Sequence, residues 1–194
     1  MFIKSRIREY DIEECNISIL RKHKIISDSE FLVLQKSKER RLIFVGNLIK
    51  EDPNIYKIIS TETDKAIKAF IELNNINLAS ISEICFDALW IIGGKLITTR
   101  KINGLNIRCK REYTSLLEIG KMKFYYNSLT GELETRYVGK GIKDDKPLLL
   151  IIKSVMGLLE SGDSISAYKI IHNYNSSQKA YNQFIHDMLN ELNI

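Results

Sequence analysis

The stretch Ile84-Cys85-Phe86-Asp87-Ala88-Leu89-Trp90-Ile91-Ile92 places one carboxylate between apolar and aromatic residues on both sides. Removing such a charge from water is costly unless the group is paired or coordinates a metal ion. The runs on either side of Asp87 are typical of two strands, which predicts a β-hairpin with Asp87 at its bend. A buried helix is the alternative, because short apolar runs do not distinguish the two. In both cases Asp87 needs a partner, which makes it a candidate functional residue.

A second aspartate, Asp11, follows another strand-like run. Residues 2–10 resemble a β-strand, and Asp11 then opens a polar turn into a short helix from Cys15 to His23. Aspartate is also a favoured residue at helix N-termini, so Asp11 has a structural interpretation beside the functional one.

Helix signals dominate the segment between the two aspartates. Ser27 and Glu30 have the spacing of a capping box and predict a helix start. The basic cluster at 36–41 follows, and its charges could contact an anion. Thr61-Glu62-Thr63-Asp64 predicts the start of a second helix that runs through Asn74, because apolar residues recur there at helical spacing.

The second half of the chain predicts strands followed by helices. Strands are expected at 105–119, 123–126 and 133–138, and helices from Lys146 onward with a stop near Gly162. The fold class predicted is therefore α+β, an antiparallel sheet with helices packed on it.

Composition sets the broad class of the protein. The 194 residues are 44% hydrophobic and 27% charged, with a net charge of +5, as expected for one globular domain or one domain with an added lobe. Basic residues concentrate in 1–50 and 95–123, a distribution compatible with a nucleic-acid partner. No apolar run is long enough to span a bilayer, and the three cysteines lack the spacing of a disulfide framework or zinc site, so we expect a cytoplasmic protein without a membrane partner.

Two segments resemble motifs of one enzyme family. Asp11-Ile12-Glu13-Glu14-Cys15-Asn16-Ile17-Ser18-Ile19-Leu20 resembles the first palm motif of family B DNA polymerases, which is an aspartate, two variable residues and Ser-Leu-Tyr-Pro-Ser-Ile. Phe86-Asp87-Ala88-Leu89-Trp90-Ile91 is similar to the later Thr-Asp-Ser motif, whose aspartate is the second metal ligand. Cys85 replaces the first aspartate of the usual Asp-Thr-Asp, and Asn16 corresponds to a tyrosine that excludes a ribose 2′-hydroxyl.

Two later segments extend the resemblance. Lys123-Phe124-Tyr125 is similar to the Lys-x-Tyr element that holds the primer-template, and Gly139-Lys140-Gly141-Ile142 resembles the Lys-Gly-Ile that often follows. The resemblance implies a palm-like α+β domain at 1–140 with fingers-like helices at 28–75, and a helical thumb-like segment at 141–194.

The function implied by the resemblance is metal-dependent nucleotidyl transfer to a DNA 3′ end, by a minimal DNA polymerase-like protein without a proofreading domain. The implied cofactor is Mg²⁺ or Mn²⁺, held by Asp11, Asp87 and the main-chain carbonyl of Ile12. The implied partners are a DNA primer-template, dNTPs and other replication proteins. Residues implied to contact the nucleotide are Asn16, Lys38, Arg40 and Arg41, and those implied to contact nucleic acid are Lys110, Lys121, Lys123 and Tyr125.

Two other functions remain open from the sequence. The same basic segments could serve a non-catalytic nucleic-acid-binding or regulatory protein of a phage or plasmid. The turn-like segment 158–163 also resembles the turn of an α-hairpin interaction module, although a single copy is too few for a solenoid.

Overall fold

The computed structural model describes residues 1–98 and 101–177, and the chain forms two compact units. The central unit is Arg8–Arg111, and the flanking unit combines Met1–Ile7 with Glu112–Ile194. Strands β1 (Phe2–Ile12) and β5 (Leu105–Ile119) contribute residues to both units. The part of the predicted C-terminal helical segment at 178–194 lies outside the described residues.

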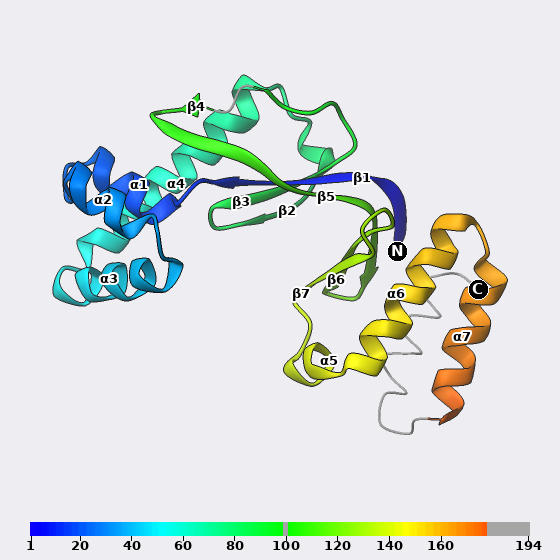
Figure 1. The fold of residues 1–194 in the computed structure, drawn as a ribbon. Coiled ribbons are helices and arrows are strands. Elements are labelled where there is room, and N and C mark those ends of the chain that lie inside the picture. The colour runs from blue at the N-terminus through cyan, green and yellow to red at the C-terminus, as the bar shows by residue number, and fades with distance from the viewer. Residues whose placement is uncertain (99–100, 178–194) are drawn as a thin grey trace. The chain divides into compact units, whose positions relative to one another are not determined.

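The central unit contains four strands in the order β2-β3-β1-β5, with four helices inserted after β1 (Figure 1). A short strand, β4, pairs antiparallel with the start of β5. Bounds of the remaining elements of this unit are α1 (Cys15–Lys22), α2 (Asp28–Leu34), α3 (Lys38–Glu51), α4 (Asn54–Leu73), the 3₁₀ turn η1 (Leu78–Ser80), β2 (Ile81–Cys85), β3 (Ala88–Ile92) and β4 (Lys101–Ile102).

The segment around Asp87 forms a β-hairpin, so the hairpin prediction is confirmed and the buried helix is wrong. Strands β2 and β3 are antiparallel, and Cys85 pairs with Ala88, which leaves Phe86 and Asp87 as a two-residue turn. Phe86 has a φ of 50°, in the left-handed region that bulky residues seldom adopt. This turn fixes the backbone that carries the Asp87 side chain.

Two helix starts were predicted, and one of them lies elsewhere. The Ser27 hydroxyl accepts from the Glu30 N–H while the Glu30 carboxylate accepts from the Ser27 N–H, so the capping box at α2 is confirmed. Helix α4 begins at Asn54 instead of near Thr61. Ile55 and Ile59 are buried in line with the later core positions, and burial of this longer stripe carries the helix through the polar segment at 61–64.

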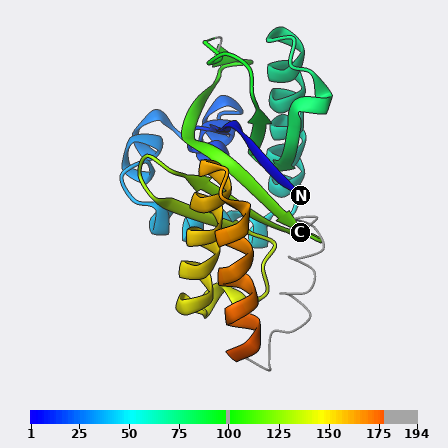
Figure 2. The ribbon, with the colours of Figure 1, turned by 90° about the vertical axis from the view of Figure 1, so that its right-hand side faces the viewer.

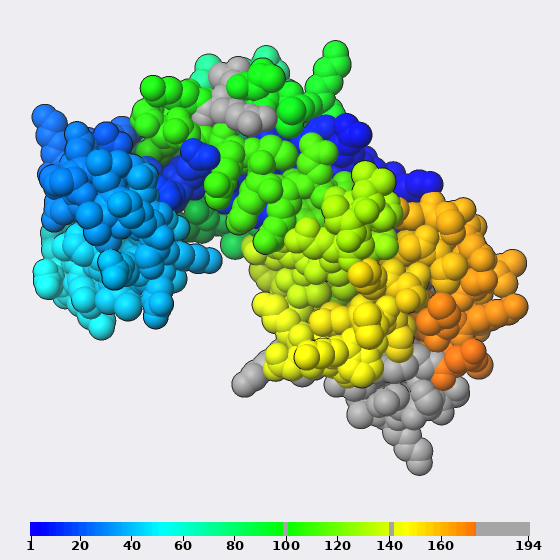
Figure 3. All heavy atoms as spheres, viewed as in Figure 1, coloured from blue at the N-terminus to red at the C-terminus, as the bar shows by residue number. Residues whose placement is uncertain are grey.

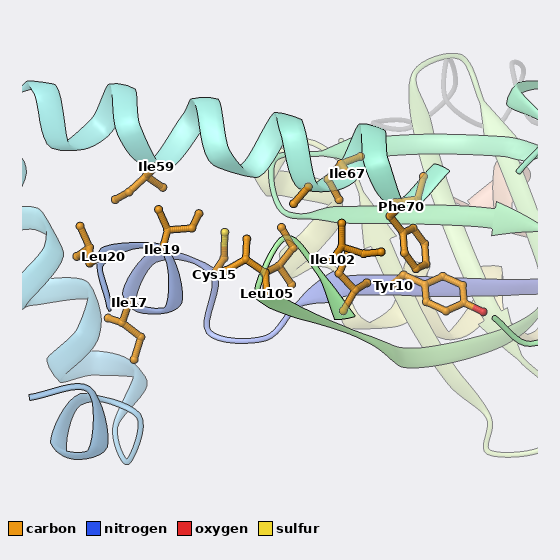
Figure 4. Packing of buried hydrophobic residues seen from close by; sticks show 14 of the residues in the cluster. Tyr10, Cys15, Ile17, Ile19, Leu20, Ile59, Ile67, Phe70, Ile102 and Leu105 are labelled. Atoms are coloured by element: carbon orange, nitrogen blue, oxygen red, sulfur yellow. The ribbon is translucent and has the colours of Figure 1, made fainter. Parts of the chain in front are cut away.

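The core of the central unit lies between α4, α1 and the strands (Figure 4). The rings of Tyr10 from β1 and Phe70 from α4 are 5.4 Å apart between centroids. Full burial of one such apolar side chain contributes about 1.5–3 kcal/mol. Because α1 begins at Cys15, three residues after Ile12 ends β1, this packing holds the end of β1 in place. In the space-filling view the helices α1 to α3 form one continuous blue-to-cyan lobe of the unit (Figure 3).

The flanking unit contains the antiparallel strands β5, β6 (Met122–Asn127) and β7 (Glu132–Arg136), followed by α5 (Lys140–Asp144), α6 (Lys146–Ser161) and α7 (Ser164–Ser177). Helices α6 and α7 lie side by side (Figures 1 and 2). Gly162, with a φ of 86°, ends α6 in the left-handed conformation. The core of this unit includes Leu117, Phe124, Leu148, Ile152, Val155, Met156 and Ile171.

Together the elements make an α+β protein with an antiparallel sheet, as predicted. Among the described residues, no helix has both the length and the apolar content needed to cross a bilayer.

Candidate functional site

The two aspartates singled out in the sequence come together at one edge of the central unit. The Ile12 N–H, directly after Asp11, donates to the main-chain oxygen of Asp87 at 3.0 Å. The end of β1 is therefore hydrogen-bonded to the turn of the β2–β3 hairpin. Seventy-five residues, including helices α1 to α4, separate the two aspartates in the sequence. The hydrogen bond brings the two ends of this segment together.

Both aspartates line a pocket of about 570 Å³ within the central unit. The pocket draws on the end of β1, the start of α1, the start of α3, the hairpin turn and β5. Seven of the residues predicted for the site are among its lining residues: Asp11, Ile12, Asn16, Lys38, Arg41, Asp87 and Lys110. Glu14, Cys15, Ile17, Leu42, Phe86 and Arg108 complete the lining.

Two cations from β5 contact the Asp11 carboxylate. Arg108 donates from Nε to Asp11 Oδ1 at 2.9 Å, and Lys110 Nζ lies 3.2 Å from Asp11 Oδ2. The Asp11 side chain is only 10% exposed, whereas that of Arg108 is 49% exposed. This hydrogen bond to Asp11 raises the pKa of Arg108 above its usual value. Both carboxylate oxygens of Asp11 thus have a cationic partner.

Lys110 also pairs with a second, more deeply buried acid. Its Nζ lies 3.1 Å from Glu9 Oε1, and Arg111 approaches the other oxygen of Glu9 at 3.8 Å. The Glu9 side chain is 3% exposed. Glu9 and Asp11 are two residues apart on β1 and Arg108 and Lys110 are two apart on β5, so each pair lies on one face of its strand. Lys110 thus bridges the two acids of β1.

The Asp87 carboxyl is partly buried beside the charged residues of the pocket. Burial raises the pKa of its carboxyl above the usual value, and the nearby charge of Asp11 acts in the same direction. The hydrogen bond with its own main chain opposes this effect, as do the charges of Lys110 and Lys38. The net effect is that the folded protein favours the protonated form of the Asp87 carboxyl more than water does.

The start of α3 contributes two cations to the pocket lining. Ser37 caps this helix through its hydroxyl, which accepts from the Arg40 N–H at 3.3 Å. Lys38 and Arg41 line the pocket one turn apart. Arg41 donates to Glu14 Oε1 at 2.9 Å and to the Gln35 carbonyl at 3.0 Å, which fixes its guanidinium beside the pocket.

The first turn of α1 lines the floor of the pocket with uncharged groups. Cys15 Sγ is 3.2 Å from Thr63 Oγ1, and burial raises the pKa of this thiol to about 12, so it stays neutral. Asn16 Oδ1 is shielded from solvent and has no hydrogen-bond partner among the described residues. A buried acceptor without a partner is costly, and a donor group of a bound ligand would satisfy it.

Four residues predicted for the site are not among the residues that line the pocket. Arg40 is exposed on α3. The other three belong to the flanking unit: Lys121 is exposed in the β5–β6 turn, and Lys123 Nζ lies 3.3 Å from Glu118 Oε1. Tyr125 is fully buried, with its ring centroid 5.3 Å from that of Tyr113. A role for these residues in nucleic-acid binding stays a prediction.

Arg108 and Glu14 are pocket residues that the motifs did not reveal. Arg108 precedes Lys110 by two positions on a predicted strand, so strand alternation alone placed both on one face. Glu14 adopts a left-handed backbone, with a φ of 49°, at the turn into α1. Its pairing with Arg41 joins residues 27 apart and had no local signal in the sequence.

The side chains that line this pocket do not by themselves form a metal site. Among residues 1–98 and 101–177, no cluster of three or more His, Cys, Asp or Glu side chains could hold a metal ion. Magnesium, however, is commonly bound by one or two carboxylates with the remaining positions taken by water and substrate phosphates. Asp11 and Asp87 line the pocket together, but Arg108 and Lys110 occupy both oxygens of the Asp11 carboxylate, which leaves no free oxygen of Asp11 for such an ion.

Comparison with known proteins identifies the family of the chain. A family model described as "Bacteriophage PBS1 gene 130 protein" matches residues 1–185. The chain belongs to this phage protein family. Its matched region includes every residue of the pocket and all the described elements of both units. Neither the curated proteins nor the solved structures contain a significant match.

Proposed function

We propose that the chain is a minimal DNA polymerase-like protein that performs metal-dependent nucleotidyl transfer to a DNA 3′ end. The observation that carries this proposal is the convergence of Asp11, Asp87, Lys38 and Arg41 on one pocket. These residues come from three separate segments: Asp11 and Asp87 belong to the two motif-like segments, and Lys38 and Arg41 belong to the basic cluster at 36–41. The pocket volume of about 570 Å³ is in the range of small-molecule and cofactor sites.

The charges of the pocket support a polyphosphate substrate. Asp11 and Asp87 would hold Mg²⁺ or Mn²⁺ together with the Ile12 carbonyl, and the metal would neutralise charge on the phosphates and lower the pKa of the attacking hydroxyl. Lys38 and Arg41 would bind the phosphates from the start of α3, with Arg41 oriented by Glu14. Asn16 Oδ1 would accept a hydrogen bond from the bound nucleotide.

Incorporation of labelled dNTPs on a primed template tests this function. The wild type, Asp11→Ala and Asp87→Ala would be compared with Mg²⁺ and with Mn²⁺, and Asp64→Ala, an exposed aspartate of α4, is the matched control. We expect each site variant to lose at least about a hundredfold in incorporation because charge stabilisation at a transferring phosphoryl group is a large part of catalysis.

Equal incorporation by all four proteins would reject the catalytic assignment. Template binding that persists without incorporation in the wild type would instead favour the non-catalytic nucleic-acid-binding alternative. Parallel assays with rNTPs would show which sugar the pocket accepts, since Asn16 stands at the position of the polymerase tyrosine.

A further inference from the structure

We propose that a groove along α1 binds single-stranded nucleic acid without a metal ion. Basic side chains of the groove hold the phosphates, and planar side chains stack on the bases. The groove joins the pocket of the two aspartates to a second, larger pocket of the central unit. The inference rests on the proposed function only for the class of partner, nucleic acid, and it requires neither a bound metal nor catalysis.

Two adjoining pockets form the groove. The second pocket has a volume of about 1010 Å³, and Glu14 and Arg108 line it as well as the first. Residues 15–17 at the start of α1 line the first pocket, whereas Ser18 and Arg21 farther along the helix line the second. The eight residues of α1 span about 12 Å. The second pocket alone is at the upper end of the volumes of small-molecule sites, so the two together suit a chain-like ligand better than a single small molecule.

Positive charge without an acidic partner lies in both pockets. Lys24, two residues after the end of α1, lines the second pocket, and Lys38, at the start of α3, lines the first. Both lysines are exposed, and no ion pair to either is found among the described residues. Two cations in separate pockets can contact separate phosphates of one strand, and such contacts bind the backbone without reading its sequence.

The acidic residues of the groove leave these two lysines unneutralised. All but Asp87 already pair with an arginine or lysine of the same lining: Asp11, Glu13, Glu14 and Asp28.

The ion pairs of Asp11 place two further cations for a phosphate. Arg108 donates from Nε to Asp11, and 49% of its side chain is exposed, which leaves other N–H groups of the guanidinium available to an anion. Lys110 has three N–H donors, of which Glu9 and Asp11 take two. The same contacts that exclude a metal from Asp11 therefore hold these two cations beside the groove.

Phe86 offers a stacking surface in the first pocket. It lines that pocket and is 45% exposed, although it is a large aromatic residue. Its φ of 50° lies in the left-handed region, which a bulky side chain adopts at an energetic cost. Such strain is concentrated at ligand-binding sites, and exposed rings beside basic side chains are what bases stack on in proteins that bind single strands.

Arg21 offers a planar surface in the second pocket. Its Cζ lies 4.7 Å from the centroid of the Phe31 ring, and its Nε donates to Asp28 Oδ1 at 2.6 Å. These contacts hold the guanidinium in place while 47% of the side chain stays exposed. Bases stack on guanidinium planes as well as on aromatic rings. An acidic protein segment would use the same lysines, but a planar surface in each pocket favours nucleic acid.

Fluorescence anisotropy of a labelled oligothymidylate, titrated with the full chain in EDTA, tests the groove. Lys24→Gln and Lys38→Gln should each weaken binding about threefold and reduce the slope of log affinity against log salt by about 0.7, because each removes one phosphate contact. Lys57→Gln is the matched control, since Lys57 is an exposed lysine of α4 that lines neither pocket. It should change neither quantity.

Stacking is tested separately from charge. Phe86→Ala should weaken binding at least about fivefold and leave the salt slope unchanged, because stacking on a ring releases no counterion. Phe86→Leu, which keeps an apolar side chain but has no ring, should weaken binding to a similar extent. Tyr56→Ala, at a 57% exposed aromatic of α4, is the control and should bind like the wild type. Circular dichroism confirms that each variant is folded before it is titrated.

Four results would overturn the groove. They are the absence of binding by the wild type in EDTA, a salt slope in Lys24→Gln and Lys38→Gln equal to that of Lys57→Gln, wild-type affinity in Phe86→Leu, and equally strong competition by polyglutamate or by a DNA duplex. The first two reject the phosphate contacts, the third rejects the stacking, and the fourth rejects single-stranded nucleic acid as the ligand.

Lys24 separates this inference from the proposed function, because it lies outside the pocket of the two aspartates. Weakened strand binding in Lys24→Gln, with no incorporation of dNTPs by the wild type, supports the groove and rejects nucleotidyl transfer. Unchanged strand binding and unchanged incorporation in Lys24→Gln reject the groove and leave nucleotidyl transfer standing.

Discussion

At the scale of single residues, the pKa of Asp87 depends both on its local sequence and on the tertiary structure. Its place at the bend of the β2–β3 hairpin is visible in the sequence, whereas the burial that raises its pKa is a property of the folded chain. The nearby charge of Asp11 adds to the effect, and that contribution exists only because β1 ends beside the hairpin turn. A buried carboxylate whose ionised form destabilises the folded protein is typical of functional sites, where activity and stability are in conflict.

Asp87→Asn should therefore stabilise the metal-free protein at pH 7. The folded-state pKa of Asp87 lies above its unfolded value, so its charged form destabilises the folded state at high pH. This penalty is fully present above the folded-state pKa and disappears as the pH falls to the unfolded value of 3.8. We expect a gain of about 0.5 kcal/mol or less at pH 7, because solvent screens this partly exposed carboxyl, and a difference that vanishes below pH 3.8. Urea denaturation without metal measures both.

Asp64→Asn on the exposed surface of α4 is the control and should leave stability unchanged within about 0.5 kcal/mol. A destabilising Asp87→Asn would mean that the carboxylate makes structural interactions in the folded protein that outweigh its burial.

At the scale of elements, the starts of α2 and α4 separate capping from core packing as causes of helix formation. Helix α2 starts where its capping box predicts, at Ser27 and Glu30, because two main-chain N–H groups find side-chain acceptors there. Helix α4 passes through Thr61 without a break, although the residues from Thr61 to Asp64 have the composition of a cap. The core residues on either side of Thr61 decided its conformation.

Ser27→Ala and Thr61→Ala should consequently have opposite effects. Loss of the cap at Ser27 should cost about 1 kcal/mol in the free energy of unfolding. Thr61 lies inside a helix and is exposed, so alanine should stabilise the protein by a few tenths of a kcal/mol through its higher helix propensity. Urea denaturation of both variants gives the comparison, and a larger loss at Thr61 than at Ser27 would contradict the assignment of the helix starts.

At the scale of the whole molecule, each compact unit has its own hydrophobic core. Phe70 belongs to the core of the central unit and Ile152 to that of the flanking unit, and both side chains are fully buried. Helices α1 to α4 therefore depend on one set of contacts, and α6 and α7 on another. The pocket residues all lie in the central unit.

Phe70→Ala and Ile152→Ala should loosen different parts of the chain. Each removes a buried side chain and should cost about 2–5 kcal/mol. In native-state hydrogen exchange, Phe70→Ala should lower protection mainly in α1 and α4, and Ile152→Ala mainly in α6 and α7. Protection that falls equally in all four helices with either variant would mean that the two cores open as one cooperative unit.

The amino-acid sequence by itself determined the elements. The residue pattern at 105–119 predicted the long strand β5. The turn-forming residues at 127–132 and Gly162 predicted a turn and a helix end, and the isolated charge of Asp87 predicted the hairpin bend. These features follow from interactions between residues close in the chain, namely hydrogen bonds, capping and burial of one face. The same local signals identified most of the pocket residues, because motifs at strand ends and helix starts are continuous in sequence.

Only the tertiary structure decided what each pocket residue faces. The start of α4 at Asn54, the pairing of Arg41 with Glu14 and the position of Arg108 and Lys110 on Asp11 depend on segments that are distant in the chain. Burial is a property of the assembled core, so no local pattern could reveal that both oxygens of Asp11 already have cationic partners. The sequence thus selected the residues of the candidate site, and packing of β5 against β1 determined their electrostatic state.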